Sequence, residues 1–186
     1  SVNVLGRKGF PGEFEIEYDP VDIGIPGDVD VKLKNPGFEE LDEKKMPLEW
    51  RTITSNSFGY KEFRADSEIK RSGRYALKAA PSVDSKTGVE YAFIVRTNPF
   101  DVNPTSDVVY SIWLRAAEDD TKVDIALLDA TYKGQGTYVK SVSVGETWSK
   151  YELRCRLNSE ITKAYVGFKV YSGTVWADDA GLHPGN

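Results

Sequence analysis

The sequence lacks several features that would point to common classes of protein. It has one cysteine, Cys155, and one histidine, His183, among 186 residues. One cysteine cannot form an internal disulfide, and His183 has no nucleophile, base or metal-ligand pattern around it. No apolar run approaches the roughly 18 to 20 residues that a membrane-spanning helix needs. Apolar positions nowhere keep helical spacing over three turns, so the sequence argues against a membrane span and against a helical fold.

Positive charge is also sparse and scattered. The formal net charge is -5, and the 24 Lys and Arg residues form no basic stripe, which argues against a nucleic-acid partner. The chain begins with Ser1 and shows no signal segment. We expect it to be a piece of a longer protein, so the missing signal segment says nothing about export.

What the sequence does contain is alternation. Apolar residues make up 40% of the chain, enough for one domain with a substantial core. In residues 164–171, Ala164, Val166, Phe168 and Val170 alternate with Tyr165, Gly167, Lys169 and Tyr171. Residues 150–157 alternate in the same way and place Cys155 on the apolar side, where we expect an inert thiol. Similar patterns predict strands at 48–54, 58–64, 75–80, 89–97, 108–116, 122–130 and 137–144. About ten strands at this spacing predict an all-β fold, an antiparallel β-sandwich.

Residues 1–31 differ from the rest of the chain. They contain five glycines and three prolines around one alternating run at 13–18, which predicts a single short strand between turns. We therefore divide the chain into an N-terminal extension or linker, 1–31, and a β-sandwich module, 32–186.

Five motifs together resemble a known family. They are NPGFEE at 35–40, SGRYALK at 72–78, NPFDVNPTSDVVYSIWLRA at 98–116, ETWSKYEL at 146–153 and VWADDAGL at 175–182. In this order the chain resembles the carbohydrate-binding modules of families 4, 9, 16 and 22, jelly-roll sandwiches attached to secreted glycan-degrading enzymes. The resemblance covers about residues 32–183 and leaves the ligand open, since the binding face is where such modules differ most.

A metal site is expected where the first and last motifs meet. Phe38 should face the core and Glu39 the rim, and the last strand should bring Asp178 beside the first. Two neighbouring carboxylates repel unless a cation or water separates them, and a hard cation such as calcium suits oxygen ligands. The resemblance implies the same structural calcium, held by Glu39, Asp178 and backbone carbonyls around Arg71 and Ser72. The alternative is two ordinary rim carboxylates paired to Lys or Arg; Asp179 is a less expected ligand.

A sugar-binding surface needs flat apolar rings for sugar faces and polar side chains for hydroxyl groups. Each candidate tyrosine has a structural role as its alternative, and Trp113 either covers an outer surface or stands in the binding cleft. The expected ligand-binding residues are Tyr91, Tyr132, Tyr171, Lys169, Gln135, Arg96 and Trp113.

The sequence therefore predicts a non-catalytic carbohydrate-binding module that tethers an extracellular polysaccharide-degrading enzyme to a β-linked glycan of the xylan, glucan or mannan type. The partners implied are a polysaccharide or oligosaccharide and an appended catalytic domain in the same longer chain, with no nucleic acid and no membrane. A structural or adhesion sandwich without a sugar ligand is the alternative. A jelly-roll glycanase or lyase is less expected, because the closely spaced carboxylates, at 13–17 and 27–30, lie outside the motif-bearing part.

Overall fold

The computed structural model describes residues 32–53, 59–131 and 137–185, and in these ranges the chain forms strands and no helix. There is accordingly no helix in the described ranges that is long and apolar enough to cross a membrane. The strands are β1 (Trp50–Ile53), β2 (Tyr60–Asp66), β3 (Ala76–Val83), β4 (Glu90–Tyr91), β5 (Phe93–Thr97), β6 (Phe100–Asp101), β7 (Asp107–Ala116), β8 (Thr121–Asp129), β9 (Thr137–Val144), β10 (Ser149–Arg156), β11 (Lys163–Val170) and β12 (Val175–Pro184).

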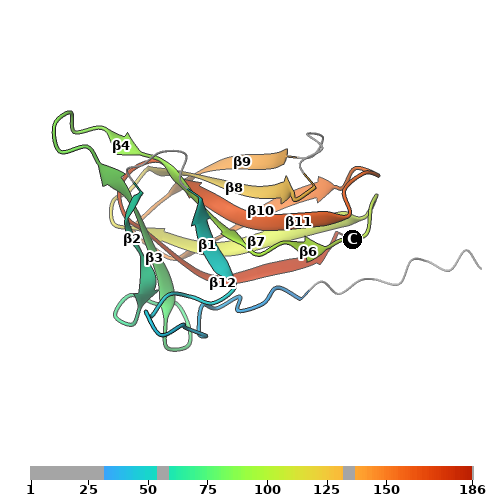
Figure 1. Cartoon of the computed structure of the whole chain (residues 1–186), viewed down its shortest axis with the longest axis horizontal. Coiled ribbons are helices and arrows are strands. Elements are labelled where there is room, and N and C mark those ends of the chain that lie inside the picture. The colour runs from blue at the N-terminus through green and yellow to red at the C-terminus, as the bar shows by residue number, and fades with distance from the viewer. Residues whose placement is uncertain (1–31, 54–58, 132–136, 186) are drawn as a thin grey trace, which may run out of the picture.

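Two antiparallel sheets lie face to face (Figure 1). The first sheet has the order β1-β5-β11-β8-β9, with β6 paired to one end of β11. The second sheet has the order β10-β7-β12-β3-β2, with β4 paired to β3. Neighbours in each sheet are mostly distant in sequence, as in a sandwich whose chain crosses repeatedly between layers. The predicted antiparallel β-sandwich is thus confirmed.

Most strands fall where alternation predicts them. The predicted run at 89–97 is divided into β4 and β5, and the short strand β6 was not predicted. The predicted N-terminal strand at 13–18 and the predicted division at residue 31 concern residues outside the described ranges, so both stay predictions.

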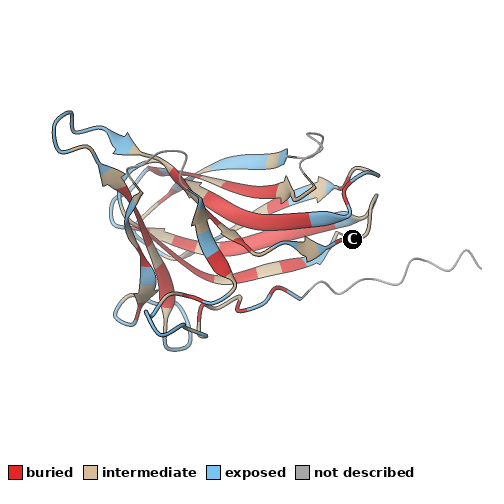
Figure 2. Cartoon of the chain, viewed as in Figure 1, coloured by how far each residue is buried: buried red, intermediate tan, exposed pale blue. Residues whose placement is uncertain are grey.

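The core lies between the two sheets and consists of every second side chain along each strand. Val166, Phe168 and Val170 of β11 face inward from the first sheet, and Tyr110, Ile112 and Leu114 of β7 face them from the second; all are essentially inaccessible to solvent. Figure 2 shows buried segments along β11, β7 and β12, whereas β9 and the tip of the β3–β4 hairpin are mostly exposed. Each strand therefore presents its remaining side chains on an outer face.

The segment 32–40 does not form the strand that was expected. Asn35 and Phe38 have positive φ angles of 48° and 57°, and the Phe38 amide donates to the Asn35 carbonyl at 3.2 Å. The Asn35 side chain then accepts from the Glu40 amide at 2.9 Å and donates to the Leu48 carbonyl at 2.8 Å. A turn stabilised in this way cannot join a ladder, so only one backbone bond, from Ala180 to Pro36 at 2.9 Å, links it to β12. Phe38 is nevertheless fully buried as expected, 4.8 Å from the Trp50 ring.

Gly167 allows the central strand of the first sheet to approach its neighbour closely. A Cβ at this position would lie 2.1 Å from the Val95 carbonyl oxygen on β5, a distance that no side chain tolerates. Gly167 lies beside Ala126 of β8 on the outer face. Both residues are nevertheless buried, so neighbouring side chains cover the middle of that face.

The Tyr110 hydroxyl is an exception within the apolar core. The residue is inaccessible to solvent, and its oxygen has no hydrogen-bond partner among the described residues. Burial raises the pKa of Tyr110 well above its usual range, so the hydroxyl keeps its proton. An unpaired buried hydroxyl costs about 1 to 3 kcal/mol relative to one in water.

We expect Tyr110→Phe to raise the free energy of unfolding by about 1 kcal/mol, because it removes that unpaired hydroxyl and keeps the ring. Urea unfolding monitored by tryptophan fluorescence measures the change. The control is Tyr151→Phe, which deletes a hydroxyl that donates to the Ser143 carbonyl at 2.9 Å and should not gain stability. A lower free energy of unfolding in Tyr110→Phe would contradict the conclusion that the Tyr110 hydroxyl is buried without a hydrogen-bond partner.

Candidate functional site

The outer face of the first sheet gathers side chains from five strands. The register places Arg51 of β1, Arg96 of β5, Gly167 of β11, Ala126 of β8 and Val139 of β9 in one row across the sheet. The next row holds Ile53, Ile94, Lys169, Asp124 and Ser141. Side chains in such rows stand on the same side of the sheet. This side points away from the core, because the alternating residues Val95, Phe168 and Ile125 are buried. We call it the outer face of the first sheet.

Three of the predicted ligand residues belong to this outer face. Arg96 and Lys169 lie in the two rows, and Tyr171 follows β11 directly with the same alternation. The structure therefore brings Arg96, Lys169 and Tyr171 together on one surface.

Tyr171 is held in place by a carboxylate and two lysines. Its hydroxyl donates to the Asp124 Oδ2 at 2.5 Å, and the ammonium groups of Lys169 and Lys122 lie 4.4 and 4.8 Å from its ring centre. The hydrogen bond to Asp124, together with burial, raises the pKa of Tyr171. Burial alone would raise the pKa of Asp124, but hydrogen bonds from Ser141 and Tyr171 and the two nearby lysines lower it. Asp124 therefore stays ionised at neutral pH and orients the ring.

Arg96 is organised in a similar way by Tyr165. The guanidinium carbon lies 3.7 Å from the centre of the Tyr165 ring, within the range of a cation–π contact. Tyr165 is only 5% exposed, because the arginine covers it. The Arg96 Nε is itself buried and has no hydrogen-bond partner within the described part of the chain.

Tyr91 lies apart from this set, on β4 in the β3–β4 hairpin. Figure 1 shows that hairpin projecting from one end of the sandwich. The Tyr91 hydroxyl donates to Asp84 Oδ2 at 3.4 Å, and the neighbouring Glu90 accepts from the Gly173 amide at 3.2 Å. The hairpin is thereby joined to the turn after β11, which carries Tyr171. Tyr132 and Gln135 lie outside the described residues.

Trp113 lies on the opposite side of the molecule. It belongs to β7 and alternates with the buried Ile112 and Leu114, so it stands on the outer face of the second sheet. The Arg71 guanidinium covers its ring at 3.8 Å. Trp113 therefore does not share a surface with Arg96, Lys169 and Tyr171, because the two sheets separate them.

Four further residues of the outer face were not among the predicted site residues. Tyr165 and Lys169 are four apart on one strand, so the alternation in 164–171 already placed them on one side. The others come from strands whose order in the sheet cannot be read from alternation. The set is Arg51, Lys122, Asp124 and Tyr165.

The expected metal ligands do converge, together with Asp179. A Cβ built on Gly37 would lie 3.7 Å from Asp179 Oδ1, 3.8 Å from Glu39 Cγ and 3.9 Å from Asp178 Oδ1. Asp179 has a positive φ of 44°, and the register of β12 shifts just after Asp178. This bulge lets two successive side chains point to the same place, which regular alternation forbids.

Backbone amides and arginines surround these carboxylates. Asp178 Oδ2 accepts from the amides of Arg71 and Ser72 at 3.0 and 3.1 Å. Glu39 Oε1 accepts from the amides of Arg74 and Tyr75 at 2.8 and 3.2 Å. Asp179 accepts from Ser72 Oγ at 3.0 Å and pairs with the Arg71 guanidinium. The turn thus presents amides, and not the expected carbonyls, to the acidic groups.

The charge balance of this cluster is nevertheless unfavourable for Asp178. Burial raises the pKa of Asp178 to about 6, the Asp179 carboxylate adds to that rise, and the amides of Ser72 and Arg71 oppose it. Hard oxygen ligands and excess negative charge suit calcium chemically. However, no group of three or more His, Cys, Asp or Glu side chains in the described ranges has the geometry of a metal site. Calcium therefore stays a prediction.

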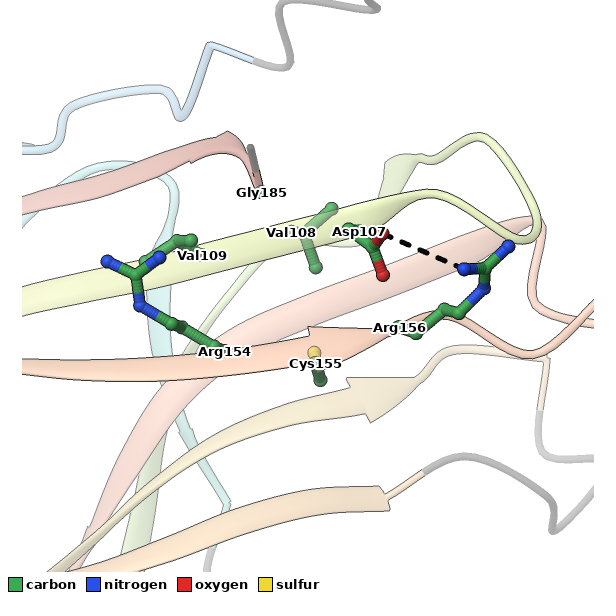
Figure 3. Close-up of a pocket in the computed structure, with 7 residues that line it drawn as sticks. All are labelled: Asp107, Val108, Val109, Arg154, Cys155, Arg156 and Gly185. Carbon is green, nitrogen blue, oxygen red and sulfur yellow. Dashed lines mark ion pairs between the residues drawn. The ribbon is translucent and has the colours of Figure 1, made fainter.

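A hollow of about 300 Å³ lies elsewhere, at the ends of β7 and β10 (Figure 3). Arg154, Arg156 and Asp107 line it, and Arg156 lies 3.8 Å from the Asp107 carboxylate. Burial raises the pKa of Cys155 in its wall to about 11, so the thiol is protonated at neutral pH. No aromatic ring lines this hollow among the described residues, and it offers a sugar no flat apolar surface.

Comparison with known proteins shows the fold. No protein-family model matches the sequence, and no curated protein matches it. Among solved structures, a family 61 carbohydrate-binding module in complex with β-1,4-galactotriose is 17% identical, with a TM-score of 0.58, over 82% of this chain and 97% of that one. A family 4 module is 15% identical, with a TM-score of 0.57, over 82% of this chain and 99% of that one. The chain has the jelly-roll fold of these modules, as the sequence resemblance implied.

The fold also occurs inside larger proteins of another kind. The enzymatically active domain of bacteriophage CBA120 tailspike protein 4 is 14% identical, with a TM-score of 0.62, over 82% of this chain but only 21% of that one. Function must therefore be argued from the surface of this chain.

Proposed function

We propose that this chain is a non-catalytic carbohydrate-binding module. The observation that carries the proposal is the convergence of Arg96, Lys169 and Tyr171 on the outer face of the first sheet. Polar groups that converge around such a surface are what sugar hydroxyl groups require. The solved modules of the same fold add support.

The proposed ligand is a β-linked polysaccharide of the xylan, glucan or mannan type, and the proposed setting is extracellular. Binding would keep an appended polysaccharide-degrading domain near its substrate, which raises the effective substrate concentration without new chemistry. Tyr91, Tyr132 and Gln135 stay candidates for additional contacts. A structural or adhesion role is the competing function, and it predicts no affinity for any glycan.

Affinity electrophoresis through gels that contain soluble xylan, β-glucan or mannan tests this proposal. We expect at least one polysaccharide to retard the protein, and Tyr171→Ala to reduce that retardation because it removes the ring that Lys169 and Lys122 contact and the hydroxyl that donates to Asp124. Lys150→Ala is the control, since Lys150 pairs with Glu152 on the second sheet. Unretarded migration in every gel would contradict binding of these three glycans, and the same result with charged glycans would contradict sugar binding and favour the structural role.

We also propose that Glu39 and Asp178, with backbone groups around Arg71 and Ser72, hold a structural calcium ion. When bound, the ion would offset the repulsion between the buried Asp178 carboxylate and the partly exposed carboxylates of Glu39 and Asp179, and would join the first loop to the last strand. Support comes from the convergence of the carboxylates and from the burial of Asp178. An ion there would compete with the Arg71 guanidinium for Asp179.

Calcium should raise the melting temperature by about 5 °C or more over a chelator-treated sample, because it binds only the folded state. Differential scanning calorimetry measures the shift. The variant Glu39→Gln should lose most of it, whereas Asp101→Asn, at an exposed carboxylate that lies 3.4 Å from Lys163, should keep it. Identical melting with calcium and with chelator would overturn the assignment.

A further inference from the structure

The two outer faces of the sandwich differ in how their cations are paired. On the second sheet, Lys150 and Arg154 both contact Glu152, at 3.0 and 3.2 Å. Lys78 and Arg64 likewise contact Glu62, at 2.7 and 3.9 Å. Each of these carboxylates faces two cations and offsets one of the two positive charges, and Arg115 of β7 forms no ion pair with another described residue.

The outer face of the first sheet has unpaired cations instead. None of its four central cationic side chains forms an ion pair with any other described residue; they are Arg51, Arg96, Lys122 and Lys169. One carboxylate, Asp124, lies among them: Tyr171 and Ser141 donate to it, and the nearby charges of Lys122 and Lys169 lower its pKa, so it offsets one of the four positive charges. Lys163 and Asp101 pair at the end of the face. The centre of this face is therefore positive in a chain whose net charge is -5.

The four cations follow a diagonal across four neighbouring strands. Arg51 and Arg96 are directly opposite each other on β1 and β5. Lys169 lies one strand further and two residues along β11, and Lys122 one strand further again on β8. Strand spacing of about 4.8 Å and a rise of about 3.3 Å per residue give this line a length of roughly 20 Å. A line of that length suits an extended polymer better than a single small anion.

The aromatic rings on this face are covered by the same cations. Arg96 lies over the ring of Tyr165, and Lys169 and Lys122 both contact the ring of Tyr171. A neutral sugar stacks on an open ring face, and these two rings present cations in its place. These contacts restrain the three cationic side chains, which lowers the entropy that binding would cost.

We propose that the glycan bound on the outer face of the first sheet carries anionic groups, carboxylate or sulfate, along a β-linked backbone. This inference rests on the proposed carbohydrate-binding function and names the class of its ligand. The Arg96 guanidinium, held over the Tyr165 ring, supplies positive charge for such a group. The lysines on Tyr171 supply further charge on the same diagonal. Residues 1–31 hold seven acidic and two basic residues, which accounts for the whole net charge of -5, so residues 32–186 carry no net charge in sum. The cations on this face are therefore a local excess of positive charge to which a polyanion would be attracted.

The test compares one backbone with and without charge. Isothermal titration calorimetry uses hydroxyethyl cellulose as the neutral probe, carboxymethyl cellulose as the carboxylated probe and cellulose sulfate as the sulfated probe. We expect a charged derivative to bind at least about tenfold more tightly than the neutral one near 0.05 M salt. This difference in affinity should be lost near 1 M salt, where the Debye screening length falls to about 3 Å. The derivative that binds more tightly identifies the anionic group.

A pair of charge-matched variants locates the binding surface. Lys122→Gln/Lys169→Gln should abolish the preference for the charged derivative. Lys150→Gln/Arg154→Gln lowers the net charge equally on the second sheet and should keep the preference. Equal losses in the two variants would overturn the proposed site. Equally tight binding of poly-glutamate would overturn it as well, because the protein would then bind any polyanion.

Two other outcomes separate this inference from the proposed function. If xylan or hydroxyethyl cellulose binds as tightly as the charged derivatives, the anionic ligand is wrong and the carbohydrate-binding function stands. If no neutral or charged glycan binds at all, both are wrong.

Discussion

The burial of the Asp178 carboxylate against the turn at Arg71 and Ser72 is the contact on which the closure of this sandwich depends. Asp178 is inaccessible to solvent on a central strand of the second sheet, and two amides of the turn donate to one of its oxygens. Glu39 receives two further amides from the same turn. Three segments that are far apart in sequence are thereby joined at one edge. A buried carboxylate is tolerated only with such partners, which explains why the first loop folds back across β12 instead of extending.

This closure separates two surfaces with different chemistry. The second sheet carries paired charges and a tryptophan that is covered by Arg71. The first sheet carries cations that contact tyrosine rings. A surface whose charges already pair internally gains little from a charged ligand, whereas one with unpaired, ordered cations gains more. Both the proposed function and the nature of its ligand follow from this difference.

Alternation in the sequence was sufficient to predict the strands, because a sheet buried on one face requires a period of two. It also predicted that Phe38 is buried and that Lys169 and Tyr171 share a side. It could not predict strand order, so Lys122 and Asp124 were not recognised as neighbours of Tyr171. Nor could it place Trp113 on the opposite sheet from the other ligand candidates. The turn at Asn35 and the bulge at Asp179 depend on positive φ angles set by tertiary contacts. Alternation cannot reveal such angles. It therefore did not predict the turn in 32–40, and it made Asp179 a less expected ligand than Asp178.

The central claim is that ligand binds across the outer face of the first sheet. The most direct measurement is backbone amide NMR during titration with the glycan that binds most tightly. The account predicts that the largest shift changes fall on β5, β8 and β11, around Arg96, Asp124 and Lys169. Changes confined to β7 and β10, around Trp113 and Glu152, would contradict it.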